Sequence, residues 1–296
     1  MERYRGRFAP SPTGPLHFGS LVAAAGSYLE ARARGGAWLV RIDDLDPPRV
    51  VPGAADDILR TLEACGMEWD EPVAFQSARR EAYRQALDRL LERGLAYPCS
   101  CSRREIADSA LPGLEGYVYP GTCRSGLPED RPARAWRVRT EGATIGFDDD
   151  VQGRVEQDLE RDCGDFVLHR ADGVYAYQLA AAVDDAAQNI THVVRGADLL
   201  VSTPRQIHLQ RLLGLPTPRY AHLPVAVNAQ GEKLSKQTYA APIDRGNPLA
   251  ALSAVLKFLG HEPPPGAISA GTGGLWRWAI SNWDLKRVPR AVPAPT

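Results

Sequence analysis

Short apolar blocks and one long alanine-rich stretch alternate at the start of the chain. Residues 4–9 and 37–42 have the length and composition of strands, and residues 20–33 between them suit a helix. A strand, a helix and a strand in this order form a βαβ unit, whose crossover makes the two strands parallel. The pattern therefore predicts a parallel α/β fold.

The alternation of helix and strand recurs along the chain. One helix is expected to begin near Pro52 and stop at Gly66, and another to begin after Ser77 and stop at Gly94, since glycine often follows a helix. Further on, the pattern predicts a strand at 192–195, a helix from Thr203 to Gly214, a strand at 222–227 and one apolar helix at 249–259.

The segment 97–173 has a different texture, because turns, prolines, arginines and short apolar runs replace the regular pattern. We predict an α/β, Rossmann-type parallel sheet that this insertion splits, followed by a small helical segment. The boundaries we assign are 1–96 and 180–240 for the two Rossmann halves, 97–179 for the inserted module and 241–296 for the C-terminal segment. We found no internal repeat.

Composition narrows the class of protein. The chain has 296 residues, 44% of them hydrophobic, which is enough to bury a core. There is no run of 18 apolar residues and no apolar signal sequence, so we expect no membrane segment and a cytoplasmic location. A net charge of -1 argues against non-specific adhesion to nucleic acid but leaves room for a local basic surface.

A candidate phosphate site follows the first strand. Residues 7–14 pass through two prolines and a glycine and lead to His17 and Gly19 at the expected start of a helix. Backbone N–H groups at a helix N-terminus and an imidazole donor hold phosphates, while Gly19 lets a base or ribose approach the backbone. The alternative for His17 is a histidine that caps a turn.

A second motif, Lys233-Leu234-Ser235-Lys236, follows the strand expected at 222–227. Its two ammonium groups and hydroxyl suit the charge that grows on a leaving pyrophosphate, with a solvated turn as the alternative. Together with His17, this motif resembles the HIGH and KMSKS signatures of class I aminoacyl-tRNA synthetases. The resemblance implies an ATP site with Mg²⁺, formed by His17, Gly19, Lys233 and Lys236, in which His17 and Lys236 are catalytic.

The resemblance is closest to glutamyl-tRNA synthetases. It rests on residues 7–17, 40–46, 165–170, 183–185 and 194–198, and it covers roughly residues 5–245. Full-length members carry a C-terminal anticodon-binding domain, which this chain ends too soon to hold. The chain thus resembles the truncated branch of glutamyl-queuosine tRNA(Asp) synthetases. This implies ATP-dependent, tRNA-independent activation of L-glutamate and its transfer to queuosine at the wobble position of tRNA(Asp).

A dicarboxylic substrate requires cations, and arginine binds a carboxylate through two parallel hydrogen bonds. Arg7 and Arg195 each lie at a strand end in one half of the expected sheet, so both can reach the crevice beyond the strands. A surface ion pair is the alternative for each. The resemblance adds Tyr177, for which core packing is the alternative, and also implies glutamate contacts from Phe8, Ala9, Pro10 and Ser11.

Asp43 stands where the family has a glutamate that holds the substrate's ammonium group. Because aspartate is one methylene shorter, a water or the neighbouring Asp44 and Asp46 would have to share this contact. Asp184 and Asp185 are also acidic and close to the pocket segment, and we interpret them as structural.

Three of the five cysteines lie close together, with no histidine between residues 99 and 123. Structural zinc takes four ligands and prefers thiolates, and a loop-rich segment gains stability from a closed site. We predict one structural Zn²⁺, with three free thiols as the alternative. The resemblance implies Cys99, Cys101, Tyr119 and Cys123 as ligands, while Glu115 or Tyr117 can substitute for the tyrosine.

Basic residues interleaved with aromatic ones can bind unpaired nucleotides, but tryptophans at such spacing more often pack a helix onto the protein. The groups in question are Arg131, Arg134, Arg137 and Arg139, and Arg277, Lys286, Arg287 and Arg290 among Trp276, Trp278 and Trp283. Two rival functions stay open: a compact synthetase that charges the 3′ end of tRNA, and a non-catalytic zinc-dependent RNA-binding relative. We expect a monomer.

Overall fold

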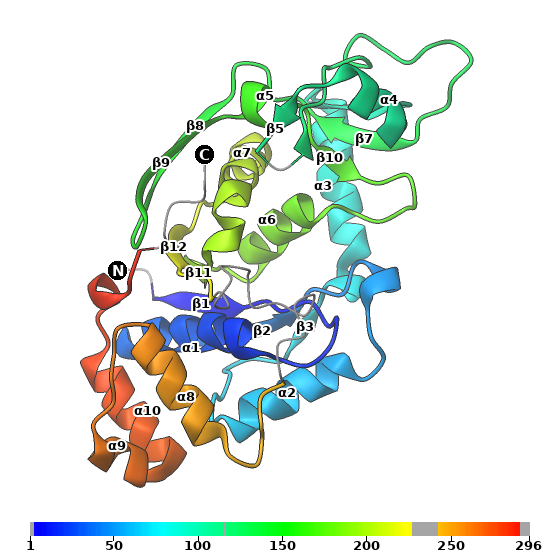
Figure 1. Ribbon diagram of the computed structural model, residues 1–296. Coiled ribbons are helices and arrows are strands. Elements are labelled where there is room, and N and C mark those ends of the chain that lie inside the picture. The colour runs from blue at the N-terminus through cyan, green and yellow to red at the C-terminus, as the bar shows by residue number, and fades with distance from the viewer. Residues whose placement is uncertain (1–2, 115, 227–241, 291–296) are drawn as a thin grey trace.

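The computed structural model describes residues 3–114, 116–226 and 242–290 (Figure 1). Its strands are β1 (Arg5–Phe8), β2 (Ala37–Ile42), β3 (Ala74–Phe75), β4 (Ala96–Cys99), β5 (Pro112–Gly113), β6 (Gly116–Tyr117), β7 (Ala135–Val138), β8 (Thr144–Asp149), β9 (Gly153–Asp158), β10 (Val167–His169), β11 (His192–Gly196) and β12 (Arg219–Leu223). Its helices are α1 (Phe18–Ala33), α2 (Ala54–Ala64), α3 (Arg80–Glu92), α4 (Arg103–Ser109), α5 (Leu159–Asp162), α6 (Tyr177–Ala187), α7 (Thr203–Leu213), α8 (Pro248–Phe258), α9 (Pro265–Ser269) and α10 (Gly271–Asn282).

The predicted βαβ unit is present, since β1 and β2 are parallel and α1 connects them. Nearly every residue of β1 and β2 is buried, as expected for parallel strands covered on both faces. Gly26 lets α1 approach β12 closely, because a Cβ there would lie 2.4 Å from Leu223 Cδ1. The helix therefore packs directly on the sheet.

Two sets of strands, parallel except for the antiparallel pair β8-β9, form the centre of the molecule. One has the order β1-β2-β3 and the other β11-β12-β8-β9, and the Thr191 N–H donates to the Arg5 carbonyl where β1 meets β11. Figure 1 shows α1 on one side of these strands and α6 and α7 on the other. The class I parallel α/β arrangement expected from the sequence is confirmed.

The segment after α3 builds a smaller antiparallel sheet, β10-β7-β4, and the short hairpin β5-β6. It also contributes the hairpin β8-β9, of which β8 pairs with β12. The segment thus supplies both a separate small unit and two strands of the second central sheet. This double role places Asp149, the last residue of β8, next to β12.

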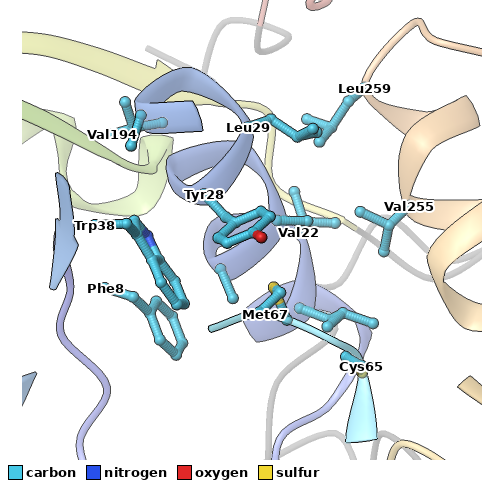
Figure 2. Close-up of a cluster of buried hydrophobic side chains, with 14 of the residues drawn as sticks. Phe8, Val22, Tyr28, Leu29, Trp38, Cys65, Met67, Val194, Val255 and Leu259 are labelled. Carbon is cyan, nitrogen blue, oxygen red and sulfur yellow. The ribbon is translucent and has the colours of Figure 1, made fainter. Parts of the chain in front are cut away.

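The main hydrophobic core lies between α1, the central strands and the C-terminal helices. Figure 2 shows Trp38 between Phe8 and Tyr28, and Val255 and Leu259 of the C-terminal region facing Val22 and Leu29 of α1. The Trp38 indole donates to Ser27 Oγ at 3.0 Å, so its polar atom is satisfied inside the core.

The apolar helix predicted at 249–259 is present as α8, and the helices α9 and α10, which the pattern does not predict, follow it. Glycines at the start of α10 lower its helix propensity and hid it from the pattern. Burial of its apolar face compensates, and the Trp276 indole donates to the Cys65 carbonyl at 2.7 Å. Trp283 likewise donates to Glu30, so both tryptophans pack as the alternative interpretation held.

The strand predicted at 222–227 is placed too late. β12 runs from Arg219 to Leu223 and ends at Pro224, whose missing N–H cannot join a ladder. Residue 227 lies outside the described residues. Among those described, no helix is long and apolar enough to cross a membrane.

Candidate active site

A cavity of about 690 Å³ opens where β1 and β11 end. Both strands deliver an arginine to it, as the carboxyl ends of neighbouring parallel strands meet at one edge of a sheet. The structure brings together most of the expected pocket residues on its wall: Arg7, Phe8, Ala9, Pro10, Ser11, His17, Gly19, Tyr177 and Arg195.

His17 is the N-cap of α1 and lines the cavity. Its Nδ1 accepts from the Ser20 backbone N–H at 3.4 Å, and Ser20 Oγ accepts from the His17 backbone N–H at 2.8 Å. This reciprocal cap aims the first turn of the helix at the cavity, where orphan N–H groups favour an anion. The capping interpretation of His17 is confirmed, and it is compatible with a phosphate site.

Lys233 and Lys236 lie outside the described residues. The described residues on either side of that segment are at the cavity: Pro224, Val225 and Ala226 line it, and Pro242 forms a bridge with His17. The Ile243 N–H also donates to the Leu16 carbonyl at 3.0 Å. The chain thus leaves from the cavity wall before the lysine motif and returns beside the histidine motif after it.

Arg7 is almost fully buried and is paired with Asp185 on α6. Its Nε and Nη2 donate to the two carboxylate oxygens at 3.1 and 3.3 Å, and Arg41 Nη1 adds a contact to Asp185 at 2.7 Å. Burial alone would raise the pKa of Asp185, but Arg7 and Arg41 together lower it to about 2. Arg7 therefore reaches the cavity with its charge already compensated.

Asp43 is directed to Arg41, whose Nε donates to it at 2.7 Å. It is buried and is not among the described residues that line the cavity. Burial raises the pKa of Asp43, although Arg41 opposes that shift. The structure thus places this carboxylate in the same ionic network as Arg7, behind the cavity wall.

Asp184, the neighbour of Asp185, accepts hydrogen bonds from Gln76, Arg79 and Tyr83. It ties the start of α3 to α6 and is fully buried. The structural interpretation of both aspartates agrees with these contacts.

Arg195 is as buried as Arg7, yet its partners are neutral. Its Nε donates to His222 Nε2 at 3.1 Å, its Nη1 to the Tyr177 hydroxyl at 3.1 Å, and its Nη2 to the Thr203 hydroxyl at 2.7 Å. No described carboxylate lies within ion-pairing distance of its guanidinium. Arg195 therefore has no carboxylate partner of its own and keeps N–H groups for an anionic ligand, and Asp198 is the carboxylate that lines the cavity near it.

His222 is held in turn by Asp149. The Nδ1 to Oδ2 distance is 2.6 Å, and the Asp149 Oδ1 accepts the backbone N–H groups of Val151, Gln152 and His222. Burial lowers the pKa of His222 to about 4, against the opposite effect of Asp149. The imidazole is therefore neutral at physiological pH.

The three clustered cysteines come together in the small unit, with their Sγ atoms all within 4.8 Å of one another. The Tyr119 hydroxyl lies 3.4 Å from Cys99 Sγ and 3.6 Å from Cys101 Sγ, and Cys101 and Cys123 are 3.6 Å apart. Zn–S bonds of about 2.3 Å in a tetrahedron give sulfur separations of about 3.8 Å, so these residues fit a metal ion.

The alternatives to Tyr119 are placed differently. Tyr117 is exposed, and Glu115 lies outside the described residues. Cys65 and Cys163 are not members of the cluster. The Tyr119 hydroxyl, by contrast, lies beside the thiols of Cys99 and Cys101.

The arginines of the insertion are mostly engaged inside the protein. Arg131 pairs with Glu105, Arg137 donates to the Asp165 carbonyl and covers the Tyr119 ring, and Arg139 donates to the Gly94 carbonyl. These contacts support the fold and do not require RNA.

Comparison with known proteins agrees with this geometry. The family described as class I tRNA synthetases (E and Q), catalytic domain, matches residues 3–247. A glutamyl-Q tRNA(Asp) synthetase from Dechloromonas aromatica is 61% identical over 97% of this chain and 96% of its own length. The chain belongs to the class I tRNA synthetases. A second relative of that description, from Chromobacterium violaceum, is 60% identical over 97% of the chain and 95% of its own length.

Solved class I synthetases share the architecture. A glutamate tRNA ligase from Elizabethkingia meningosepticum, in complex with its amino acid, superposes with a TM-score of 0.79 at 28% identity. The match covers 98% of this chain and 66% of the ligase, so the chain spans just under two thirds of that protein. A putative arginyl tRNA synthetase from Campylobacter jejuni, 15% identical with a TM-score of 0.53, shares the fold alone.

For this class I synthetase, sequence reasoning missed the support of Arg195. Thr203 was noted only as a helix start and His222 only as a strand residue, and Asp149 was not singled out. The one available signal was the run of aspartates at 148–150, which resembles any polar strand end. Contact between these residues depends on the pairing of β8 with β12, which the pattern does not predict.

Proposed function

We propose that this enzyme activates L-glutamate with ATP, without tRNA, and transfers the glutamyl group to queuosine at the wobble position of tRNA(Asp). The carrying observation is a cavity with a capped helix N-terminus at one end and buried guanidinium groups at the other, in a chain about 60% identical to glutamyl-Q tRNA(Asp) synthetases over nearly its whole length. The cavity volume suits an aminoacyl-adenylate, since ligand sites commonly measure about 300–1,000 Å³.

The ATP end of the site consists of His17, Gly19, Lys233 and Lys236. The helix N-terminus capped by His17 favours the triphosphate, and Gly19 provides close approach for the nucleoside. The lysine motif is assigned here because the residues before and after it line the cavity or pair with His17. Mg²⁺, bound by the phosphates, would offset their charge.

The glutamate end consists of residues 7–11, Tyr177 and Arg195. Arg195, which has no carboxylate partner of its own, supplies N–H groups for a substrate carboxylate, and Arg7 supplies N–H groups within a neutralised network. Asp43 is bound to Arg41, so we assign it to the support of Arg7. This removes the need for a direct contact between the shorter side chain and the substrate's ammonium group.

Catalysis in this proposal is positional and electrostatic. An oxygen of the glutamate α-carboxylate attacks the α-phosphorus of ATP, an O–P bond forms, and the bond to pyrophosphate breaks. His17 and Lys236 stabilise the charge on the phosphoryl oxygens and the leaving group. No side-chain nucleophile is required.

Exchange of labelled pyrophosphate into ATP tests the activation step. With glutamate and no RNA, exchange is expected, and Lys236→Ala should slow it by about 10²- to 10³-fold. Lys257→Ala is the matched control, because Lys257 pairs with Glu262 on the exposed side of α8. Equal rates for the two variants would remove Lys236 from the mechanism.

The transfer step separates the proposal from a synthetase that charges the 3′ end. Labelled glutamate should be accepted by tRNA(Asp) that lacks its 3′-terminal adenosine but carries queuosine. It should not be accepted by tRNA(Asp) with guanosine at the wobble position. The opposite pattern would establish 3′ charging, and absence of both exchange and transfer would favour a non-catalytic relative.

We further propose that the metal is one structural Zn²⁺, held by Cys99, Cys101, Tyr119 and Cys123, in the inserted module at 97–179 of a monomeric, cytoplasmic enzyme. Thiolate ligands favour zinc, and a closed four-ligand set leaves no catalytic position. Cys101→Ser should lose the metal and destabilise residues 97–125, as measured by metal analysis and hydrogen exchange. Cys163→Ser is the control outside the cluster; full metal content in Cys101→Ser would contradict the assignment.

A further inference from the structure

We propose that Asp149 and His222 are positioning residues that fix the guanidinium of Arg195 for the substrate carboxylate without neutralising its charge. This inference rests on the proposed function, because it takes Arg195 as the receptor of that carboxylate. Neither residue lines the cavity, so both act through Arg195.

Strand pairing brings the three residues into one row. Arg195 of β11 lies opposite His222 of β12, and Asp149 at the end of β8 lies opposite Tyr220, two residues from His222. His222 is fully buried and Asp149 almost fully. The row thus runs from the cavity wall through the second central sheet, with no exposed member.

The hydrogen bonds fix the tautomer of His222. Arg195 Nε carries a hydrogen and cannot accept, so His222 Nε2, 3.1 Å away, must accept with its lone pair. The ring proton therefore sits on Nδ1 and is donated to Asp149 Oδ2 at 2.6 Å. With Thr203 and Tyr177, this bond engages three of the five guanidinium N–H groups and leaves two, both on the Nη atoms, for a ligand.

Asp149 cannot rotate to offer a different atom. Its Oδ1 accepts backbone N–H groups from Val151, Gln152 and His222 at 3.0, 2.8 and 3.1 Å. Oδ2 alone faces the imidazole, so the carboxylate sets which ring nitrogen is protonated. A histidine oriented in this way by a buried carboxylate has a fixed tautomer and ring angle.

The Asp149 carboxylate contacts the Arg195 guanidinium only through the imidazole of His222, and this affects ligand binding. A carboxylate in direct contact with Arg195 would occupy N–H groups that the substrate needs, in the way that Asp185 takes Nε and Nη2 of Arg7. A neutral imidazole holds Arg195 equally firmly and competes for no anion. The arrangement therefore orients the cation and keeps its charge for the ligand.

Asp149→Asn provides the sharpest test, because it changes the tautomer while keeping the side-chain volume. The three backbone N–H groups require the amide oxygen at the Oδ1 position, so the NH₂ group faces His222 Nδ1. The ring proton must then move to Nε2, where it opposes the Nε–H of Arg195. We expect the KM for glutamate in pyrophosphate exchange to rise about 10- to 100-fold, with the KM for ATP unchanged.

Matched variants separate positioning from folding. Asp150→Asn changes the next residue, whose carboxylate pairs with the exposed Arg219, and should leave both KM values unchanged. His222→Gln retains an acceptor for Arg195 and should raise the glutamate KM less than His222→Leu. In the His222→Leu background, Asp149→Asn should add no further effect on the KM, since Asp149 acts through the imidazole.

Nitrogen NMR of the imidazole provides a readout that does not depend on activity. The unsubstituted protein should show the Nδ1–H tautomer of His222, and Asp149→Asn the Nε2–H tautomer. An unchanged KM for glutamate in Asp149→Asn would overturn the inference, and so would equal rises in the KM for glutamate and for ATP. In either case, glutamate-dependent exchange by the unsubstituted protein would still support the proposed function. Absence of glutamate-dependent exchange in the unsubstituted protein would overturn both.

Discussion

Two arginines that line one cavity differ in how their charge is neutralised. Arg7 is 3% exposed and Arg195 is 4% exposed, so burial does not distinguish them. Arg7 faces a carboxylate of α6 that it shares with Arg41, whereas Arg195 faces a phenol, a hydroxyl and an imidazole. The two arginines are equally buried, but only Arg7 is paired with a carboxylate. The hydrogen-bond partners, and not the depth of burial, therefore decide which guanidinium remains available to a substrate.

The two sites also differ in what their loss should affect. Around Arg7, charges compensate one another inside the protein, so removing a member leaves a buried charge unpaired and destabilises the fold. Around Arg195, the neutral partners stabilise no net charge, so a change there should act first on ligand binding.

Asp185→Asn should lower the free energy of unfolding by about 3–5 kcal/mol, because it removes the charge that compensates Arg7 and Arg41. Chemical denaturation monitored by circular dichroism measures this change. The control is Glu262→Gln, which removes an exposed ion pair with Lys257 and should cost under about 1 kcal/mol. Equal small losses would show that the Arg7 network carries little stability.

Arg195→Lys should keep the positive charge but lose the planar fork. We expect kcat/KM for glutamate to fall about 10²-fold or more, since lysine cannot bind a carboxylate through two parallel bonds, and the unfolding free energy to fall by less than in Asp185→Asn. Arg245→Lys, at an exposed ion pair with Asp57, is the matched control. A loss of stability as large as that of Asp185→Asn would contradict the contrast between the two sites.

The sites should fail in different pH ranges. The folded chain binds a proton at His222 with a pKa of about 4 against an ordinary 6.5, so the unfolded state takes up the proton first as the pH falls. The neutral His222 side chain therefore contributes about 3 kcal/mol to the free energy of unfolding above pH 6.5, and this contribution is lost as the pH falls toward 4. The Asp185 pKa, lowered from 3.8 to about 2, implies loss only below pH 4.

Unfolding free energies from pH 7 to pH 3 in the unsubstituted protein and in His222→Gln would measure that separation. The difference between the two curves should shrink between pH 6.5 and pH 4. A difference that stays constant over this range would show that His222 does not titrate on unfolding.

Tyr177→Phe should have the smallest effect, because it removes one neutral hydrogen bond to Arg195 and keeps the ring. The expected rise in the glutamate KM is about 5-fold, corresponding to roughly 1 kcal/mol. Tyr175→Phe, whose ring packs outside the cavity, is the control. A change of 100-fold would mean that the phenol contacts the substrate itself.

The parallel α/β fold, the βαβ unit and the cysteine cluster follow from the sequence pattern, and the resemblance to glutamyl-tRNA synthetases adds residues 8–11 and Tyr177 of the cavity wall. These depend on local periodicity and on motifs that short stretches of chain define. The sequence pattern misplaced β12 and missed α10, because Pro224 and the glycines of α10 acted against the apolar pattern in ways that only packing resolves.

Only the tertiary structure decided which arginine is neutralised. Arg7 and Arg195 look alike in the sequence, as arginines at strand ends, and the partners that distinguish them, Asp185 and His222, come from α6 and β12. Asp149 reaches His222 through the pairing of a hairpin from the segment after α3. The hydrophobic periodicity of the sequence predicts the face of a strand or helix on which a side chain lies. Whether a buried charge is neutralised depends instead on a partner atom within about 3 Å, which long-range strand and helix packing brings there.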